Sequence, residues 1–117
     1  MRWVLLMPVV AIFGCAPGNP LPPVAVSAQT ESAAADAIRA SLKDPYSAHF
    51  ERLRAGQDKD GSTLVCGFVN AKNSFGAYGG RKLFAVRVPV SGPASVEAFG
   101  DEAYAMGWCH RHNLMPA

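Results

Sequence analysis

A short apolar run opens the chain and differs in pattern from everything that follows it. The run covers residues 3–13, comes directly after Met1-Arg2 and ends before Gly14-Cys15. A membrane-spanning helix needs about 20 apolar residues, so this run is too short to span a bilayer. A positive start, a short apolar segment and a small residue before a cleavage site are typical of a secretory signal peptide. We therefore predict that residues 1–14 are a signal peptide.

The first periodic pattern beyond this segment predicts a helix. Apolar side chains recur at helical spacing at Ala34, Ala35, Ile38 and Leu42. Thr30 is the predicted N-cap, because its hydroxyl can accept from a free N–H of the first turn. Asp44-Pro45 ends the helix, since proline disfavours helical backbone at the residue before it.

Three strands are predicted after this helix, over residues 50–54, 62–70 and 82–90. In the second strand, alternation puts one apolar set, Leu64, Cys66 and Phe68, on one face and another, Val65 and Val69, on the other face. In the third strand one face carries Phe84, Val86 and Val88. Strands that are apolar on both faces are typical of the centre of a sheet.

A last segment, from about residue 95 to residue 112, is predicted to be helical, although Gly100 and Gly107 each weaken a helix by about 1 kcal/mol. The predicted fold class is α+β. It is a small α-β-β-β-α domain in which helices pack on a three-stranded antiparallel sheet. This domain is expected to cover residues 29–117.

The four residues Ile12-Phe13-Gly14-Cys15 resemble the cleavage signal of bacterial lipoproteins. That resemblance implies lipidation of Cys15 and a location in the cell envelope, with the domain in the periplasm. Ala16, in place of an aspartate, favours the outer membrane. Residues 15–28 would then be a proline-rich tether, which could reach about 40 Å when extended. A rival cleavage site after Ala28 would instead give a soluble periplasmic protein.

Cysteine number supports export. Without Cys15, two cysteines remain, Cys66 and Cys109, and an even number is typical of an oxidising compartment. We predict that they form a disulfide, which would close a loop of about 44 residues and stabilise the domain by about 4 kcal/mol. The alternative is two separate buried thiols, which behave as small apolar groups.

The connection between the second and third strands, residues 72–80, is the most unusual part of the chain. It contains three glycines and the aromatic residues Phe75 and Tyr78. Exposed aromatic side chains on loops are typical binding anchors. The candidate binding residues are Asn70, Lys72, Asn73, Ser74, Phe75 and Tyr78. Alternatively, both rings cover a sheet face while the asparagines satisfy the loop backbone.

Two spaced motifs surround this loop. They read Asp44-Pro45-x-Ser47-Ala48-x-Phe50 and, after Cys66-Gly67, x-Val69-Asn70-x-Lys72-Asn73-x-x-Gly76-x-Tyr78-x-Gly80. The pattern, over roughly residues 40–90, resembles a mostly uncharacterised family of small exported and lipoprotein-like proteins of Gram-negative bacteria. The resemblance implies an exported α+β domain and carries no activity, ligand or catalytic residue.

Other candidate sites are weaker. A metal site at Cys109, His110 and His112 would need a free thiolate. A hydrolase triad would combine Ser62 or Ser74 with His49 and with Asp58 or Asp60, but no serine lies in a nucleophile-elbow motif. The neighbours Asp101-Glu102 point to different faces of a helix, which argues against a glycosidase pair. We therefore predict no enzyme activity, no metal and no cofactor.

Charge completes the prediction. The 117 residues have a formal net charge of +2, spread along the chain without a basic block, so no nucleic-acid partner is expected. The predicted function is a binding or scaffold module for a partner in the cell envelope. The alternatives are an inhibitor of a lysozyme-like envelope hydrolase and a periplasmic metal-handling protein.

Overall fold

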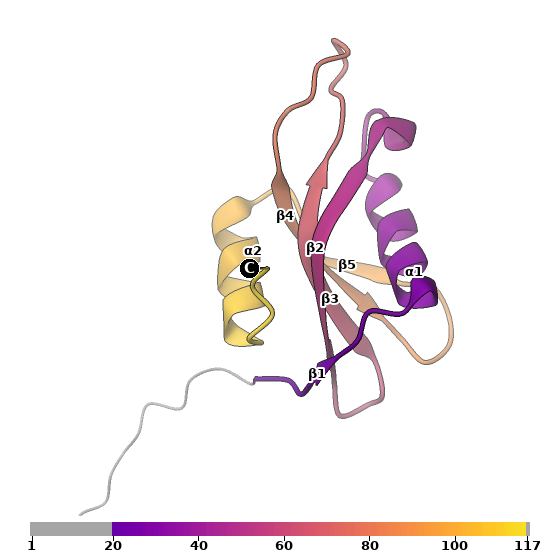
Figure 1. Cartoon of the computed structure of the whole chain (residues 1–117), viewed down its shortest axis with the longest axis vertical. Coiled ribbons are helices and arrows are strands. Elements are labelled where there is room, and N and C mark those ends of the chain that lie inside the picture. The colour runs from indigo at the N-terminus through magenta and orange to yellow at the C-terminus, as the bar shows by residue number, and fades with distance from the viewer. Residues whose placement is uncertain (1–19, 117) are drawn as a thin grey trace, which may run out of the picture.

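The computed structural model describes residues 20–116 and has α+β architecture. Five antiparallel strands pair in chain order, β1 (Pro23–Val24), β2 (His49–Gln57), β3 (Thr63–Asn70), β4 (Lys82–Val88) and β5 (Ser95–Ala98). Helices α1 (Ala28–Arg39) and α2 (Glu102–Arg111) cover opposite faces of this sheet (Figure 1). The predicted class is confirmed, whereas the predicted three-stranded sheet is too small.

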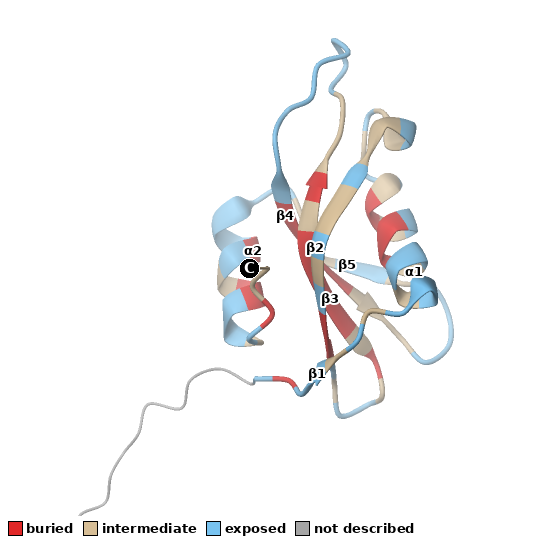
Figure 2. Cartoon of the chain, viewed as in Figure 1, coloured by how far each residue is buried: buried red, intermediate tan, exposed pale blue. Residues whose placement is uncertain are grey.

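Alternation along the central strands creates two apolar cores, one under each helix. On the α2 face, the buried set includes Leu64, Cys66, Leu83, Ala85, Trp108 and Cys109. On the α1 face, it includes Ala34, Ile38, Val65, Val69, Phe84 and Val86. Figure 2 shows buried residues gathered on β3, on β4 and on the inward sides of both helices. The assignment of β3 side chains to opposite faces agrees with the sequence pattern.

Helix α1 begins earlier than its apolar spacing suggests. Ser27, and not Thr30, is the N-cap, and its Oγ accepts from the backbone N–H of Thr30 at 3.1 Å. The three added residues at the start carry no apolar stripe, so the periodic pattern does not register them. The helix ends at Arg39, before Leu42, which packs beside the α1-face core from the following connection.

The second half of the predicted tether is part of the domain, which corrects the expected boundary at residue 29. Leu21 is buried in the α2-face core, and β1 pairs with β2 through Pro23 and Val24. Pro22 contributes a carbonyl that accepts from the N–H of Gln57 at 3.1 Å, a role open to a proline at a sheet edge. Gly56 makes room for Leu21, since a Cβ at residue 56 would lie 2.7 Å from the Leu21 Cβ.

The C-terminal segment also differs from the single helix predicted over residues 95–112. Residues 95–98 form β5, which pairs with β4, and α2 starts only at Glu102. Gly100 separates the two elements with a φ of +97°, a conformation outside the helical region. Asp101 then caps α2 by accepting from the N–H of Tyr104 at 3.0 Å.

The boundaries of the other strands shift for local reasons. Strand β2 continues past residue 54 to Gln57, and its pairing with β3 resumes after an irregularity between Glu51 and Arg54 that shifts the register. Arg52 has a φ of +53° at this point. Strand β4 ends at Val88, one residue before Pro89, which has no N–H to give to a ladder. Within residues 20–116 we find no helix with the length and apolar character needed to cross a membrane.

Candidate functional site

The connection between β3 and β4, residues 71–81, projects from the end of the sheet opposite to β1 (Figure 1). The strand register fixes this arrangement. Val69 pairs with Lys82 at the base of the connection, whereas β1 pairs with Gly56, which lies opposite Leu64 at the other end of β3. We call residues 71–81 the distal loop.

The tip of the distal loop is a tight hairpin turn. The Asn73 carbonyl accepts from the N–H of Gly76 at 3.0 Å, and the Asn73 N–H donates to the carbonyl of Ala77 at 2.8 Å. Gly76 has a φ of +79°, as expected for the last residue of a three-residue hairpin loop. The Asn73 Oδ1 accepts from the N–H groups of Phe75 and Ala77, at 2.9 and 3.2 Å. These bonds hold Phe75 at the apex, where it is 95% exposed.

Tyr78 fixes the base of the distal loop to β2. Its hydroxyl donates to the carbonyl of Ser47 at 3.2 Å and lies 3.1 Å from the Nε2 of His49. The Tyr78 and His49 rings are 5.6 Å apart, centroid to centroid. Tyr78 is 44% exposed, so one part of the ring serves this contact and the other faces solvent.

A short 3-10 turn, Pro45–Ser47, is held against the distal loop. Ser47 connects the two segments, because its Oγ accepts from the N–H of Lys72 at 2.8 Å and donates to the carbonyl of Asp44 at 2.8 Å. Tyr46, in the middle of the turn, is 99% exposed. We call the distal loop together with Pro45–Ser47 the distal surface.

Tyr46 is a candidate binding residue that the sequence pattern around the distal loop does not reveal, since it belongs to another connection. A local signal exists nonetheless. Proline at the first position of the turn and a serine that bonds inward at the third leave the middle side chain pointing outward.

The other predicted loop residues have distinct positions. Phe75 does not cover a sheet face, whereas Asn73 satisfies loop backbone groups, as the alternative interpretation expects. Ser74 is exposed beside Phe75. Asn70 pairs with His49 at the end of β3, and its buried Oδ1 has no hydrogen-bond partner among the described residues. The Lys72 Nζ lies 5.7 Å from the centroid of the Tyr78 ring.

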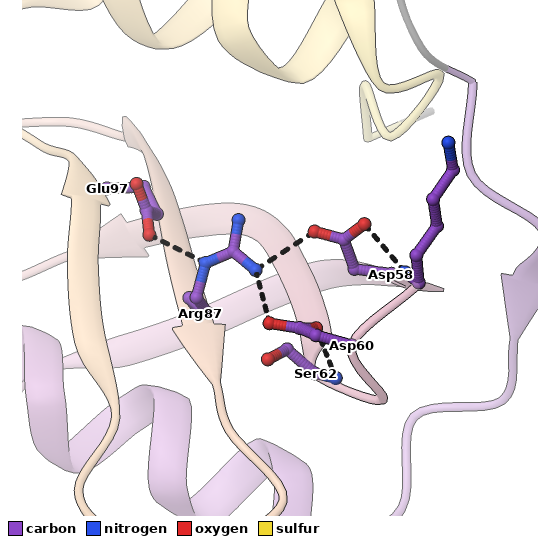
Figure 3. A network of polar contacts seen from close by, with 6 residues as sticks. Asp58, Asp60, Ser62, Arg87 and Glu97 are labelled. Atoms are coloured by element: carbon purple, nitrogen blue, oxygen red, sulfur yellow. Dashed lines mark hydrogen bonds and ion pairs between the residues drawn. The ribbon is translucent and has the colours of Figure 1, made fainter.

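A polar cluster occupies the opposite end of the sheet, centred on Arg87 (Figure 3). The Arg87 guanidinium contacts Asp58 at 2.9 Å, Asp60 at 3.7 Å and Glu97 at 3.0 Å. The backbone N–H of Lys59 and the guanidinium donate to Asp58 and lower the pKa of its carboxyl below 3.8. Bonds from Asp58 and Glu97 raise the Arg87 pKa.

The cluster separates the members of the hydrolase triad considered above. Asp60 accepts from the N–H of Ser62 at 2.8 Å, which lowers the pKa of this carboxyl too. Both aspartates and Ser62 follow the C-terminal end of β2, whereas His49 is the first residue of that strand. The triad is therefore not brought together.

The predicted disulfide is confirmed. Cys66 on β3 and Cys109 on α2 are joined, with an S–S distance of 2.10 Å and Cα atoms 6.2 Å apart. Cys109 is thus not a thiolate that could bind a metal with His110 and His112. Residues 20–116 contain no group of three or more histidine, cysteine and acidic side chains placed to hold a metal ion.

The acidic pair before α2 has structural contacts. Asp101 caps the helix, and the Glu102 Oε1 accepts from the N–H of Leu83 at 3.0 Å. Glu102 therefore joins α2 to β4, and Asp101 stabilises the start of the helix.

No protein-family model, curated protein or solved structure matches this chain. Its function must be inferred from its own residues. Residues 1–14 and Cys15 lie outside the described residues, so the signal peptide and the lipid anchor remain predictions.

Proposed function

We propose that this chain is a binding module of the bacterial cell envelope. In this proposal Cys15 carries the lipid that anchors the chain, with the outer membrane favoured, and the distal surface recognises another envelope protein. One observation carries the proposal. Phe75 is 95% exposed at the apex of a hairpin in which the Asn73 side chain accepts from the N–H groups of Phe75 and Ala77.

The exposed aromatics are arranged as binding anchors usually are. Phe75 and Tyr46 both lie on the distal surface, and Ser47 and Tyr78 bond the two segments that carry them. Aromatic side chains bury large areas on binding and lose little rotamer freedom. Hydrogen bonds that fix the segments beforehand reduce the ordering cost of association. A partner would therefore bind two aromatic rings, Phe75 and Tyr46, whose backbone segments are already held in place.

The position of the predicted anchor supports an orientation in which the distal surface points away from the membrane. Leu21 is buried in the domain, and Pro20 is only five positions after Cys15 in the sequence. Five steps along an extended chain span at most about 18 Å, much less than the roughly 40 Å expected for a tether of residues 15–28. The end of the sheet at β1 would thus stay near the membrane, and the distal loop would point away from it.

The rival cleavage site after Ala28 is less compatible with the fold. Cleavage there would remove Leu21, which is buried in the α2-face core. It would also remove β1, which pairs with β2. Lipidation at Cys15 leaves both contacts in place, which is a physical reason to prefer it.

A second candidate function, inhibition of a lysozyme-like envelope hydrolase, is favoured by the charge and shape of the distal loop. Residues 71–81 include Lys72 and Arg81 and no acidic residue, although Arg81 pairs with Glu51 at 3.0 Å. Clefts of glycosidases hold a pair of carboxylates. A projecting basic hairpin has the shape to enter such a cleft. An assay of cell-wall lysis by a lysozyme-like hydrolase would detect inhibition by the wild type, and Phe75→Ala, which alters the tip of the hairpin, should inhibit less.

The test of the main proposal is site-directed photo-crosslinking in cells that export the full chain. A benzophenone amino acid would replace Phe75 or Tyr46 on the distal surface. Val90 is the matched control, because it is 78% exposed and lies beside Gly61 at the opposite end of the sheet. We expect one protein adduct shared by positions 75 and 46 and absent at position 90. Equal adducts at all three positions, or none, would contradict the proposal.

A further inference from the structure

A cleft of about 250 Å³ lies beside the base of the distal loop. One wall comes from the segment just after α1, with Leu42 and Lys43, and the other from the loop base, with Lys72 and Gly79. Val69 also lines the cleft and gives it an apolar part. We call this the lysine cleft.

The charged residues that line the lysine cleft are all lysines, and the Nζ of one of them, Lys72, also faces the Tyr78 ring, 5.7 Å from its centroid. Three lysines line the cleft, Lys43, Lys72 and Lys82, and no carboxylate does. Within residues 20–116 none of these three forms an ion pair, in contrast to Arg39, Arg81 and Arg87, which all do. Three acidic residues close by do not line the cleft: Asp44 follows Lys43, Glu51 is paired with Arg81, and the Glu102 Oε1 accepts from the N–H of Leu83, next to Lys82.

Gly79 makes the wall of the lysine cleft open. Its φ lies outside the left-handed region that favours glycine, so the backbone does not require the absence of a side chain. Packing does not require it either, since a Cβ at Gly79 would meet no atom within 4 Å. Gly56 offers a contrast, because a Cβ there would collide with Leu21. The cleft therefore has open space at Gly79, where a bound backbone would meet no side chain.

We propose that the lysine cleft binds an acidic segment of the protein partner, with acidic side chains at the three lysines and an apolar side chain on Val69. This inference rests on the proposed function and names the chemistry of its partner. Opposite charge favours an acidic occupant and speeds association. A membrane surface is disfavoured, because the lysine cleft is concave and lies at the end of the sheet away from the predicted anchor.

The first test measures binding of a defined probe to the full-length lipidated protein in detergent. The probe is a fluorescent peptide in which glutamates alternate with phenylalanine and leucine, and the control peptide has glutamine at every glutamate. By fluorescence anisotropy we expect the acidic peptide to bind about tenfold more tightly. This preference should shrink as ionic strength rises from about 0.05 M to about 0.3 M.

Charge reversal locates the site. Lys43→Glu, Lys72→Glu and Lys82→Glu should each weaken binding of the acidic peptide several-fold. Lys59→Glu is the matched control, since Lys59 is an exposed lysine in the β2–β3 turn at the other end of the sheet and should change nothing. Gly79→Leu should weaken binding of both peptides by filling the open space. Equal affinity for the two peptides, or an equal effect of Lys59→Glu, would overturn the inference.

A second test separates this inference from the proposed function. A photo-crosslinker at position 82 should give the same protein adduct in cells as one at position 75. If position 75 still gives a protein adduct while position 82 gives a lipid adduct or none, the acidic-segment inference fails and the binding module stands. If position 75 gives no protein adduct, the proposed function fails first.

Discussion

Two aromatic residues of the distal loop, Phe75 and Tyr78, have different roles although their sequence surroundings are alike. Phe75 is held at the tip by bonds within the loop, so its exposure follows from the local turn. Tyr78 is positioned by Ser47 and His49, about 30 residues earlier in the chain. The sequence predicts a glycine-rich loop with two aromatic residues. It cannot tell the exposed ring from the bonded one, because the partners of Tyr78 are distant in sequence.

The first prediction concerns these two rings. Phe75→Ala should change the free energy of unfolding by no more than about 0.5 kcal/mol, since the ring makes no buried contact. Tyr78→Phe should cost about 0.5–1.5 kcal/mol, because it removes the hydroxyl that bonds to Ser47 and His49. Phe84→Ala, in the α1-face core, should cost about 3–5 kcal/mol and serves as the core reference. Chemical denaturation measures all three, and a loss for Phe75→Ala close to the core value would end its assignment as a binding anchor.

The polar cluster around Arg87 predicts how stability depends on pH. Hydrogen bonds lower the pKa of Asp58 and of Asp60 below 3.8 in the folded state. The contribution of both carboxylates is therefore complete above about pH 4 and is lost as the pH falls through the lowered pKa values. Arg87 stays charged throughout, because the same contacts raise its pKa.

Melting temperatures between about pH 7 and pH 2 test this prediction. Asp58→Asn should lower the melting temperature at neutral pH, since the Arg87 guanidinium loses an ionised partner at 2.9 Å. The variant should also lose less stability on acidification than the wild type does. Parallel curves for the two proteins would show that Asp58 does not contribute to the acid sensitivity.

At the scale of elements, alternation predicted β3 and β4 well because both faces of these strands are covered by helices. It missed β1 and β5, and the reason is physical. Both are edge strands of few residues, and each is defined by its neighbour's hydrogen bonds more than by its own pattern. Pro23 even argues against a strand locally, yet it pairs with Gly56, where a Cβ would collide with Leu21.

The disulfide between β3 and α2 yields a third prediction. Replacing both Cys66 and Cys109 by alanine should lower the free energy of unfolding by about 2–4 kcal/mol, because the bridge closes a loop over a sequence separation of 43 residues. Reductant should lower the stability of the wild type by a similar amount and leave the double variant unchanged. Two alkylatable thiols in the exported, unreduced protein would show that the bridge does not form in cells.

The hairpin at the tip of the distal loop yields a fourth prediction, about order in a single element. Asn73→Ala removes the Oδ1 that accepts from the N–H groups of Phe75 and Ala77, so both amides should exchange with solvent markedly faster. The global melting temperature should barely change, since the loop is exposed. Ser74→Ala is the neighbouring control. Similar exchange rates in the two variants would mean that Asn73 does not order the tip.

At the scale of the whole molecule, the two ends of the sheet differ in a way that no local pattern reveals. The end at β1 holds paired charges around Arg87, whereas the distal end holds unpaired lysines and the exposed Tyr46 and Phe75. The residues of each end come from separate stretches of sequence and meet only through strand pairing. This is why the sequence predicted only the distal loop as a binding site, whereas the fold adds Pro45–Ser47 to form the distal surface.

The last prediction concerns lipidation of Cys15, which would place the β1 end of the sheet near the membrane. A diacylglycerol on Cys15 together with an N-acyl chain exceeds the two lipid signals needed for stable membrane binding. The wild type should therefore take up labelled fatty acid and fractionate with the outer membrane, and Cys15→Ser should abolish the label. A mature N-terminus at Gln29, found by mass spectrometry, would contradict lipidation. Such a form would also lack β1 and the buried Leu21, and we expect it to unfold more readily than the chain that begins at Cys15.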